Sequence, residues 1–366
     1  MSGRPRPFAV LFKALSLFVL INFLYGLVRP PIQNISAYNT IFPGLERMPF
    51  GDDLSLYSVS IDNVDVMFAA HEISTEKGSD ELRVALVGDS SIWGEGLTVE
   101  ETLAGQWNQA GLQCGERNLR FYNLGYPHPS VVKDLIFLDE LKGRQPDAII
   151  WFITLNTMMN QYRLHPFLRE NRDRALAILE RYDIHHGARR LLAEQEDDFL
   201  QHTLLGQRES LARWLKLQAL GFVWSATAND TIAPAHTPEG LPHDVTKDPA
   251  YRGLEPGADL RSRLLLEILS AGFDLAGQAP VLLVNEPIFI AQGYNSEIRY
   301  NDLYPRWAYD QYRELLAAQV SSRAYLDLWD AVPPEYFTGT PMHLNAQGEG
   351  LLTEQITPLL LAMLCK

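Results

Sequence analysis

Residues 84–94 read VALVGDSSIWG. An apolar run ends abruptly in Gly-Asp-Ser-Ser (88–91), a small, polar cluster that favours a turn. A short apolar run that stops at such a cluster is typical of a strand buried on both faces of a parallel sheet. The stretch therefore predicts a buried strand whose carboxyl end presents Ser90 at the edge of an α/β sheet.

Four further apolar runs follow, with helical patterns between most of them. The runs are LRFYNLG (119–125), DAIIWFITL (147–155), APVLLVNEP (279–287) and RAYLDLW (323–329). Helical patterns cover 98–111 and 129–143, and the C-terminal ITPLLLAML (356–364) predicts a core helix. Alternating strands and helices predict right-handed βαβ units, so we expect an α/β fold with a doubly wound parallel sheet.

The N-terminal stretch 8–28, FAVLFKALSLFVLINFLYGLV, is apolar apart from Lys13. As a helix it would span about 30 Å, the thickness of one bilayer core. Arg4, Arg6 and Lys13 place positive charge at its leading end. By the positive-inside rule, the N-terminus is then cytoplasmic and everything after Arg29 is extracytoplasmic.

A cleaved signal peptide is the alternative interpretation of this stretch. The tolerable cleavage site follows Ala37, far beyond the apolar residues and behind Pro30 and Pro31. We therefore favour an uncleaved signal-anchor.

The remaining chain divides by composition. Residues 1–30 form the cytoplasmic N-terminus and transmembrane anchor, and residues 31–80 form a lead-in segment in which 56–68 alternates enough to predict edge strands. Residues 81–366 form the α/β domain. The long interval 160–278 between the third and fourth apolar runs exceeds one crossover helix and predicts a partly helical insertion.

Charge and cysteine content exclude some functions. A net charge of −14 over 366 residues argues against a nucleic-acid partner, which needs a basic face. Cys114 and Cys365 lack the spacing of a metal site. They could form a disulfide outside the cytoplasm or remain isolated thiols, and the sequence leaves both open.

Ligand sites in open α/β sheets form at the carboxyl ends of the strands. There the chain places Ser90, then Gly125, then Asn156, and after the last strand His343. A serine hydroxyl becomes a nucleophile when a histidine takes its proton, and the resulting oxyanion needs fixed donors. The N–H groups of Ser90 and Gly125 and the amide of Asn156 are candidate donors, while Asp89 would brace the turn.

These four pieces resemble the four motif blocks of the SGNH (GDSL-type) hydrolase superfamily. The resemblance covers roughly 80–160 and 279–364 and implies a three-layer α/β/α, flavodoxin-like fold. It implies Ser90 as nucleophile, His343 as general base and then acid, and Ser90, Gly125 and Asn156 as the oxyanion hole. Such chemistry needs no cofactor and no metal.

The chain departs from the family pattern in two places. The third block usually has Gly-x-Asn-Asp, where this chain has Thr-Leu-Asn-Thr (154–157). The family usually carries Asp three residues before the histidine, where this chain has Thr340. Three outcomes are open: a Ser-His dyad oriented by a backbone carbonyl, another acid such as Asp330 or Glu335 behind His343, or lost or very weak activity.

The resemblance and the predicted location together imply a function. We expect a membrane-anchored, extracytoplasmic serine esterase or O-acyltransferase acting on acyl esters, above all acetyl esters, of glycans, or on a small ester. The alternative is a catalytically degenerate domain that binds a glycan or a partner in envelope assembly.

Overall fold

The computed structural model describes residues 7–30, 35, 44–51, 59–159, 164–185, 187–194, 198–227 and 240–365. At its centre is a six-stranded sheet with the order β2-β3-β1-β4-β5-β6. The strands are β1 (Glu81–Gly88), β2 (Gln113–Cys114), β3 (Arg117–Gly125), β4 (Ala148–Ile153), β5 (Val281–Asn285) and β6 (Tyr325–Asp327). All neighbours pair in parallel except β2, which pairs antiparallel to β3.

The five predicted strands are confirmed, and β2 is an addition of two residues at the edge. Counted in chain order, the five parallel strands lie in the order 2-1-3-4-5, which is the flavodoxin-like arrangement. In this arrangement the strand order reverses at β1: β3 is added on one side of it and β4 on the other. The crevice between β1 and β4 is therefore the expected place for a ligand site.

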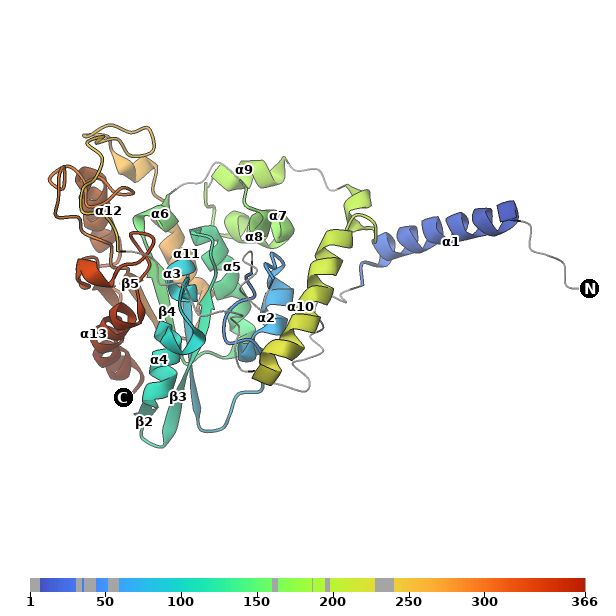
Figure 1. Cartoon of the computed structure of the whole chain (residues 1–366), viewed down its shortest axis with the longest axis horizontal. Coiled ribbons are helices and arrows are strands. Elements are labelled where there is room, and N and C mark those ends of the chain that lie inside the picture. The colour runs from blue at the N-terminus through green and yellow to red at the C-terminus, as the bar shows by residue number, and fades with distance from the viewer. Residues whose placement is uncertain are drawn as a thin grey trace, which may run out of the picture.

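Helices cover both faces of the sheet, which gives the three expected layers (Figure 1). Alternate residues of β1 face opposite layers: Ala85 and Val87 belong to one buried cluster, and Val84 and Leu86 to the other. The first layer contains α5 (Val131–Leu141), α11 (Glu267–Leu275) and α12 (Arg306–Gln319). The second contains α4 (Leu103–Ala110) and α13 (Ala346–Leu364).

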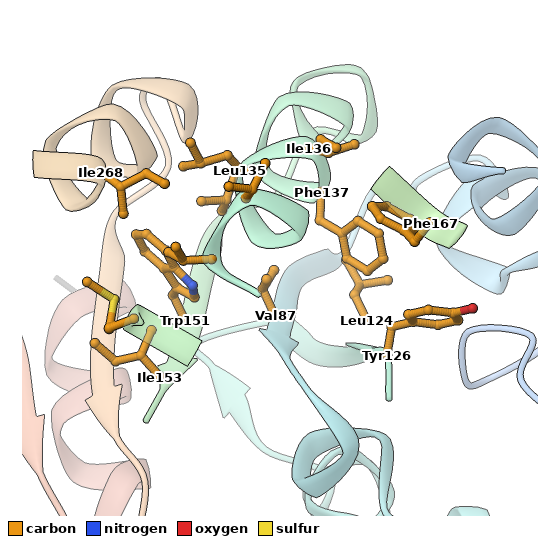
Figure 2. Close-up of a cluster of buried hydrophobic side chains, with 14 of the residues drawn as sticks. Val87, Leu124, Tyr126, Leu135, Ile136, Phe137, Trp151, Ile153, Phe167 and Ile268 are labelled. Carbon is orange, nitrogen blue, oxygen red and sulfur yellow. The ribbon is translucent and has the colours of Figure 1, made fainter. Parts of the chain in front are cut away.

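Figure 2 shows the first layer from within. The strand residues Val87, Leu124 and Trp151 point toward side chains of α5 and α11, including Leu135 and Ile268. All five side chains are at most 1% exposed. Burial on both faces explains why the strands appear in the sequence as continuous apolar runs rather than as alternating patterns.

The lead-in corrects one prediction. Of the stretch expected to form edge strands, residues 56–58 lie outside the described part, and the rest includes the helix α2 (Val64–Ala70). Asn63 caps this helix by accepting the Val66 N–H at 3.1 Å. Val64, Met67 and Phe68 are buried at i, i+3 and i+4, so the pattern that resembled alternation was a helical face.

The insertion between β4 and β5 is largely helical. It contains α6 (Leu155–Met158), α7 (Pro166–Glu170), α8 (Arg172–Arg181), α9 (Gly187–Ala193), η6 (Phe199–His202), α10 (Arg208–Thr227) and η7 (Leu260–Ser262), and α11 returns the chain to the sheet.

The two ends of the chain are placed differently. The helix α1 (Pro7–Val28) projects from the body (Figure 1) and is, within the described residues, the one helix long and apolar enough to cross a membrane. The basic residues Arg4 and Arg6, and the considered cleavage position at Ala37, lie outside the described residues. The C-terminus is tied down, because Cys365 after α13 is disulfide-bonded to Cys114 in β2.

Candidate active site

Ser90 begins a short helix, α3 (Ser90–Trp93), directly after the turn that ends β1. Asp89 caps this helix, since its Oδ1 accepts the Ser91 N–H at 3.1 Å. The helix ends at Gly94, which has a φ of +83° that favours glycine. Capping is therefore done by Asp89, and the Ser90 hydroxyl is left for another partner.

That partner is His343. Ser90 Oγ lies 2.8 Å from His343 Nε2, although 253 positions separate the two residues. The histidine sits on a tight turn after β6, in which the Thr338 N–H donates to His343 O at 2.9 Å and the His343 N–H donates to Thr340 O at 3.3 Å. The Phe289 N–H, after β5, donates to Pro341 O at 2.8 Å and ties this turn to the sheet.

The imidazole of His343 is held neutral by its surroundings. It is 7% exposed, and burial lowers its pKa from the ordinary 6.5, while the carboxylates of Glu95 and Asp89 act in the opposite direction. Glu95 Oε2 lies 3.7 Å from Nε2. A neutral imidazole in contact with a serine hydroxyl is a competent general base, and the carboxylate of Glu95 can stabilise the imidazolium that forms.

No carboxylate of the described residues hydrogen-bonds to Nδ1 of His343. The hydroxyl of Thr340 accepts the Met342 N–H at 3.4 Å instead of meeting the ring. Asp330 and Glu335 are exposed, and neither has a contact with His343. Of the three outcomes left open by the sequence, the described residues do not support a second acid behind His343, and Ser90 and His343 stand as a pair.

Two groups at this edge of the sheet are candidate donors for an oxyanion. The Ser90 N–H is the first amide of a helix, which has no acceptor in a preceding turn. Asn156 follows β4 on α6, and because β1 and β4 pair with Val87 opposite Trp151, their trailing residues share one sheet edge. The guanidinium of Arg252 donates to Oδ1 of Asn156, so Nδ2 remains as the donor for an oxyanion.

Gly125 has a clear packing role. A Cβ at this position would lie 2.2 Å from the Trp93 N and 2.6 Å from the Ile92 C, because α3 packs directly on the end of β3. Its N–H donates to Asn123 Oδ1 at 3.0 Å. The oxyanion role of Gly125 stays a prediction.

Buried charges hold the turn that carries Ser90. Lys133 of α5 is fully buried, and its Nζ donates to Gly88 O at 2.5 Å and contacts Asp134 Oδ1 at 3.0 Å. From the lead-in, Arg47 is 3% exposed and donates to the carbonyls of Trp93, Gly94 and Leu97 at 3.0–3.3 Å. Both cations therefore satisfy backbone carbonyls at either end of α3.

Beneath the nucleophile lies a chain of three polar side chains. Ser91 Oγ is 2.5 Å from Glu286 Oε2 and 3.1 Å from Asp89 Oδ1. Burial raises the pKa of Glu286 well above its usual range, and the nearby Asp89 charge adds to this. The single proton of the Ser91 hydroxyl can be donated to either Glu286 or Asp89, so this hydroxyl links the two carboxyl groups.

No signal in the sequence marks four of these residues. Arg252 lies in the insertion and Arg47 in the lead-in, where no motif marks either one, and Glu95 and Lys133 lie outside the four motif blocks. Glu286, at the end of the fourth apolar run, is expected from its position at this edge of the sheet in a structural role. For metals, the described part of the chain contains no group of three or more His, Cys, Asp or Glu side chains that could hold an ion.

No protein-family model and no curated protein matches the sequence. Among solved structures, the chain is similar to a carbohydrate acetylesterase family member from Sinorhizobium meliloti, with 13% identity and a TM-score of 0.33, over 77% of this chain and 98% of that one. A member of the lipolytic protein G-D-S-L family from Veillonella parvula has 12% identity and a TM-score of 0.33, over 76% and 97%. A psychrotrophic esterase from Pseudoalteromonas sp. has 9% identity and a TM-score of 0.36, over 78% and 100%.

These neighbours include members of the family that the four sequence motifs indicate. At 9–13% identity, the likeness to these structures is one of fold.

Proposed function

We propose that this protein is a serine esterase or O-acyltransferase, anchored in a membrane by α1 and acting outside the cytoplasm on acyl esters of glycans. The observation that carries the proposal is the 2.8 Å contact between Ser90 Oγ and His343 Nε2. It joins a hydroxyl at a helix start to a neutral imidazole, which is the arrangement that activates a serine.

In the first half of the reaction, His343 Nε2 takes the proton of Ser90 as Oγ attacks the ester carbonyl carbon. The negative charge that forms on the carbonyl oxygen is stabilised by the Ser90 N–H and by Nδ2 of Asn156. His343 then gives its proton to the departing sugar oxygen, the bond to that oxygen breaks, and the acyl group remains on Ser90.

In the second half, water or a sugar hydroxyl attacks the acyl group, and His343 takes the attacking proton. The Ser90 oxygen then departs and regains its proton from His343. Water as acceptor gives hydrolysis, and a sugar hydroxyl gives transfer. The acetyl-glycan substrate follows from the resemblance noted in the sequence and from the extracytoplasmic location.

Two observations support that location. The disulfide between Cys114 and Cys365 is typical of oxidising compartments. The helix α1 packs on the insertion, with Asn22 Oδ1 accepting the Leu205 N–H at 2.9 Å, a contact that a cleaved signal sequence would not need. Mass spectrometry of the mature chain from membranes should recover peptides from residues 7–30.

The catalytic proposal is tested with the purified full chain and p-nitrophenyl acetate. We expect Ser90→Ala and His343→Ala each to lower kcat/KM by at least about 10²-fold, because each removes a reacting group. A fluorophosphonate should label wild type at Ser90 and leave Ser90→Ala unlabelled. Ser321→Ala, at an exposed serine, is the matched control and should behave as wild type.

The second candidate function is a binding domain without turnover, and the lack of a carboxylate behind His343 favours it. Equal p-nitrophenyl acetate hydrolysis in all four proteins, with no labelling of Ser90, would establish this second function and refute the first.

A further inference from the structure

The insertion meets the apolar helix α1 through specific contacts. Asn22 Oδ1 of α1 accepts the Leu205 N–H at 2.9 Å. The rings of Phe23 and Phe199 lie 5.6 Å apart. Gly26 packs so closely that a Cβ there would lie 2.9 Å from the Phe199 ring. The segment that includes η6 is therefore fitted to one side of α1.

These contacts occur below the outer end of α1. Asn22 precedes the last helical residue, Val28, by six positions, which corresponds to about 9 Å along the axis. If α1 spans the bilayer, Leu205 lies at the boundary between headgroups and acyl chains. A backbone N–H at that depth needs a partner, and Asn22, a costly residue within an apolar helix, supplies it.

The same segment exposes large apolar side chains. Leu200 is 67% exposed, Leu205 is 56% exposed and Phe199 is 37% exposed. The start of α10 lies beside the end of α1 that meets the body (Figure 1). On α10, Leu215 and Phe222 are 60% and 38% exposed.

The exposed apolar residues of α10 recur at helical spacing and form a stripe: Ala212, Leu215, Ala219, Phe222, Val223 and Ala226. The cations Arg208 and Lys216 are exposed on the same helix. Apolar side chains with cations beside them are typical of helices that lie in a membrane interface.

We propose that residues 199–205 and the stripe of α10, together the lipid-facing surface, insert into the outer leaflet of the bilayer that α1 spans. This inference rests on the proposed anchoring by α1. Its occupant is lipid, because the surface is continuous with the helix that already lies in the bilayer. The consequence is that the domain is held in one orientation over the membrane instead of swinging on a tether.

The test uses single fluorescent labels on the full chain in vesicles of phosphatidylcholine and phosphatidylglycerol that contain doxyl-labelled lipid. Both native cysteines are in the disulfide, so an introduced cysteine supplies the free thiol. Leu200→Cys and Leu205→Cys test the surface. Leu20→Cys in α1 is the positive control, and Tyr294→Cys, 80% exposed on the loop after β5, is the negative control.

We expect labels at positions 200 and 205 to lose fluorescence as the label at position 20 does, while the label at 294 keeps its fluorescence. Loss at position 20 with none at 200 and 205 overturns the inference and leaves the anchoring intact. No loss at position 20 refutes the anchoring and the inference together. Neither outcome bears on Ser90, whose esterase activity is measured separately.

Discussion

The charge beside Nε2 of His343 distinguishes this dyad from a triad with an acid at Nδ1. Glu95 lies on the same side of the ring as the serine, at 3.7 Å from Nε2, and it is 56% exposed through its side chain. It can therefore stabilise the imidazolium without fixing the ring. The backbone turn at Thr338 and Thr340 fixes where the residue sits, and the contact with Ser90 Oγ is the hydrogen bond of the ring.

The pH dependence of kcat/KM should show the influence of the Glu95 carboxylate on His343. The base works when neutral, so kcat/KM falls as pH drops through the pKa of His343, which burial places below the ordinary 6.5. Because Glu95 raises this pKa, we expect Glu95→Gln to move the acid limb to lower pH. The measurement is kcat/KM for p-nitrophenyl acetate from pH 4 to 8. Glu100→Gln, at an exposed residue near α4, should leave the acid limb of the pH profile unchanged. An acid limb that does not move in Glu95→Gln would show that Glu95 does not influence the pKa of His343.

The hydrogen bond from the Arg252 guanidinium orients the amide of Asn156. Removing the guanidinium in Arg252→Met frees that amide to rotate, so we expect kcat to fall about fivefold and KM to change less. This fall corresponds to the loss of one hydrogen bond worth about 1 kcal/mol. Arg261→Met, at an exposed arginine of η7, is the matched control. A fall in KM alone, or an equal effect in the control, would argue against the positioning role.

At the scale of elements, the site depends on how closely α3 lies on β3. The contact is possible because Gly125 has no side chain at the point where Ile92 and Trp93 pass over it. Lys133 and Arg47 then satisfy carbonyls at either end of the helix. The serine is thus positioned by an element only four residues long that has no stability of its own.

Gly125→Ala should displace that element. Its Cβ would meet backbone atoms, which cannot rotate away, so we expect a loss of about 1–3 kcal/mol in stability and a larger loss of esterase activity. Gly143→Ala in η5 (Lys142–Arg144) meets no atom within 4 Å and should be neutral. Thermal melts and the p-nitrophenyl acetate assay on both variants measure this, and an unchanged melting temperature in Gly125→Ala would contradict the packing argument.

At the scale of the whole molecule, the disulfide closes the α/β domain. Cys114 in the edge strand β2 and Cys365 after α13 are 251 positions apart, so the bond links an edge of the sheet to the end of the last helix. A cross-link over a loop of this length restricts the unfolded chain strongly.

We expect the double variant Cys114→Ser, Cys365→Ser to lose roughly 2–4 kcal/mol of stability while its esterase activity at 25 °C persists, because the bond joins β2 to the residue after α13 and does not involve Ser90. Denaturant unfolding of both proteins, with and without a reductant, checks this. Reductant should destabilise the wild type and leave the stability of the variant unchanged. An equal effect of reductant on both proteins would show that the loss of stability does not come from this disulfide.

The parallel sheet, the strand ends and the pair Ser90 and His343 could be predicted from sequence patterns. Strands buried on both faces leave continuous apolar runs, and parallel strands bring their carboxyl ends to one edge. The division at residues 30 and 80 stays a prediction. The contacts that reach this edge from elsewhere could be found only in the folded chain: Arg252 on Asn156, Arg47 and Lys133 on α3, and Asn123 on the amide of Gly125. Those contacts join segments with no shared period or motif, and their geometry depends on how closely the elements pack.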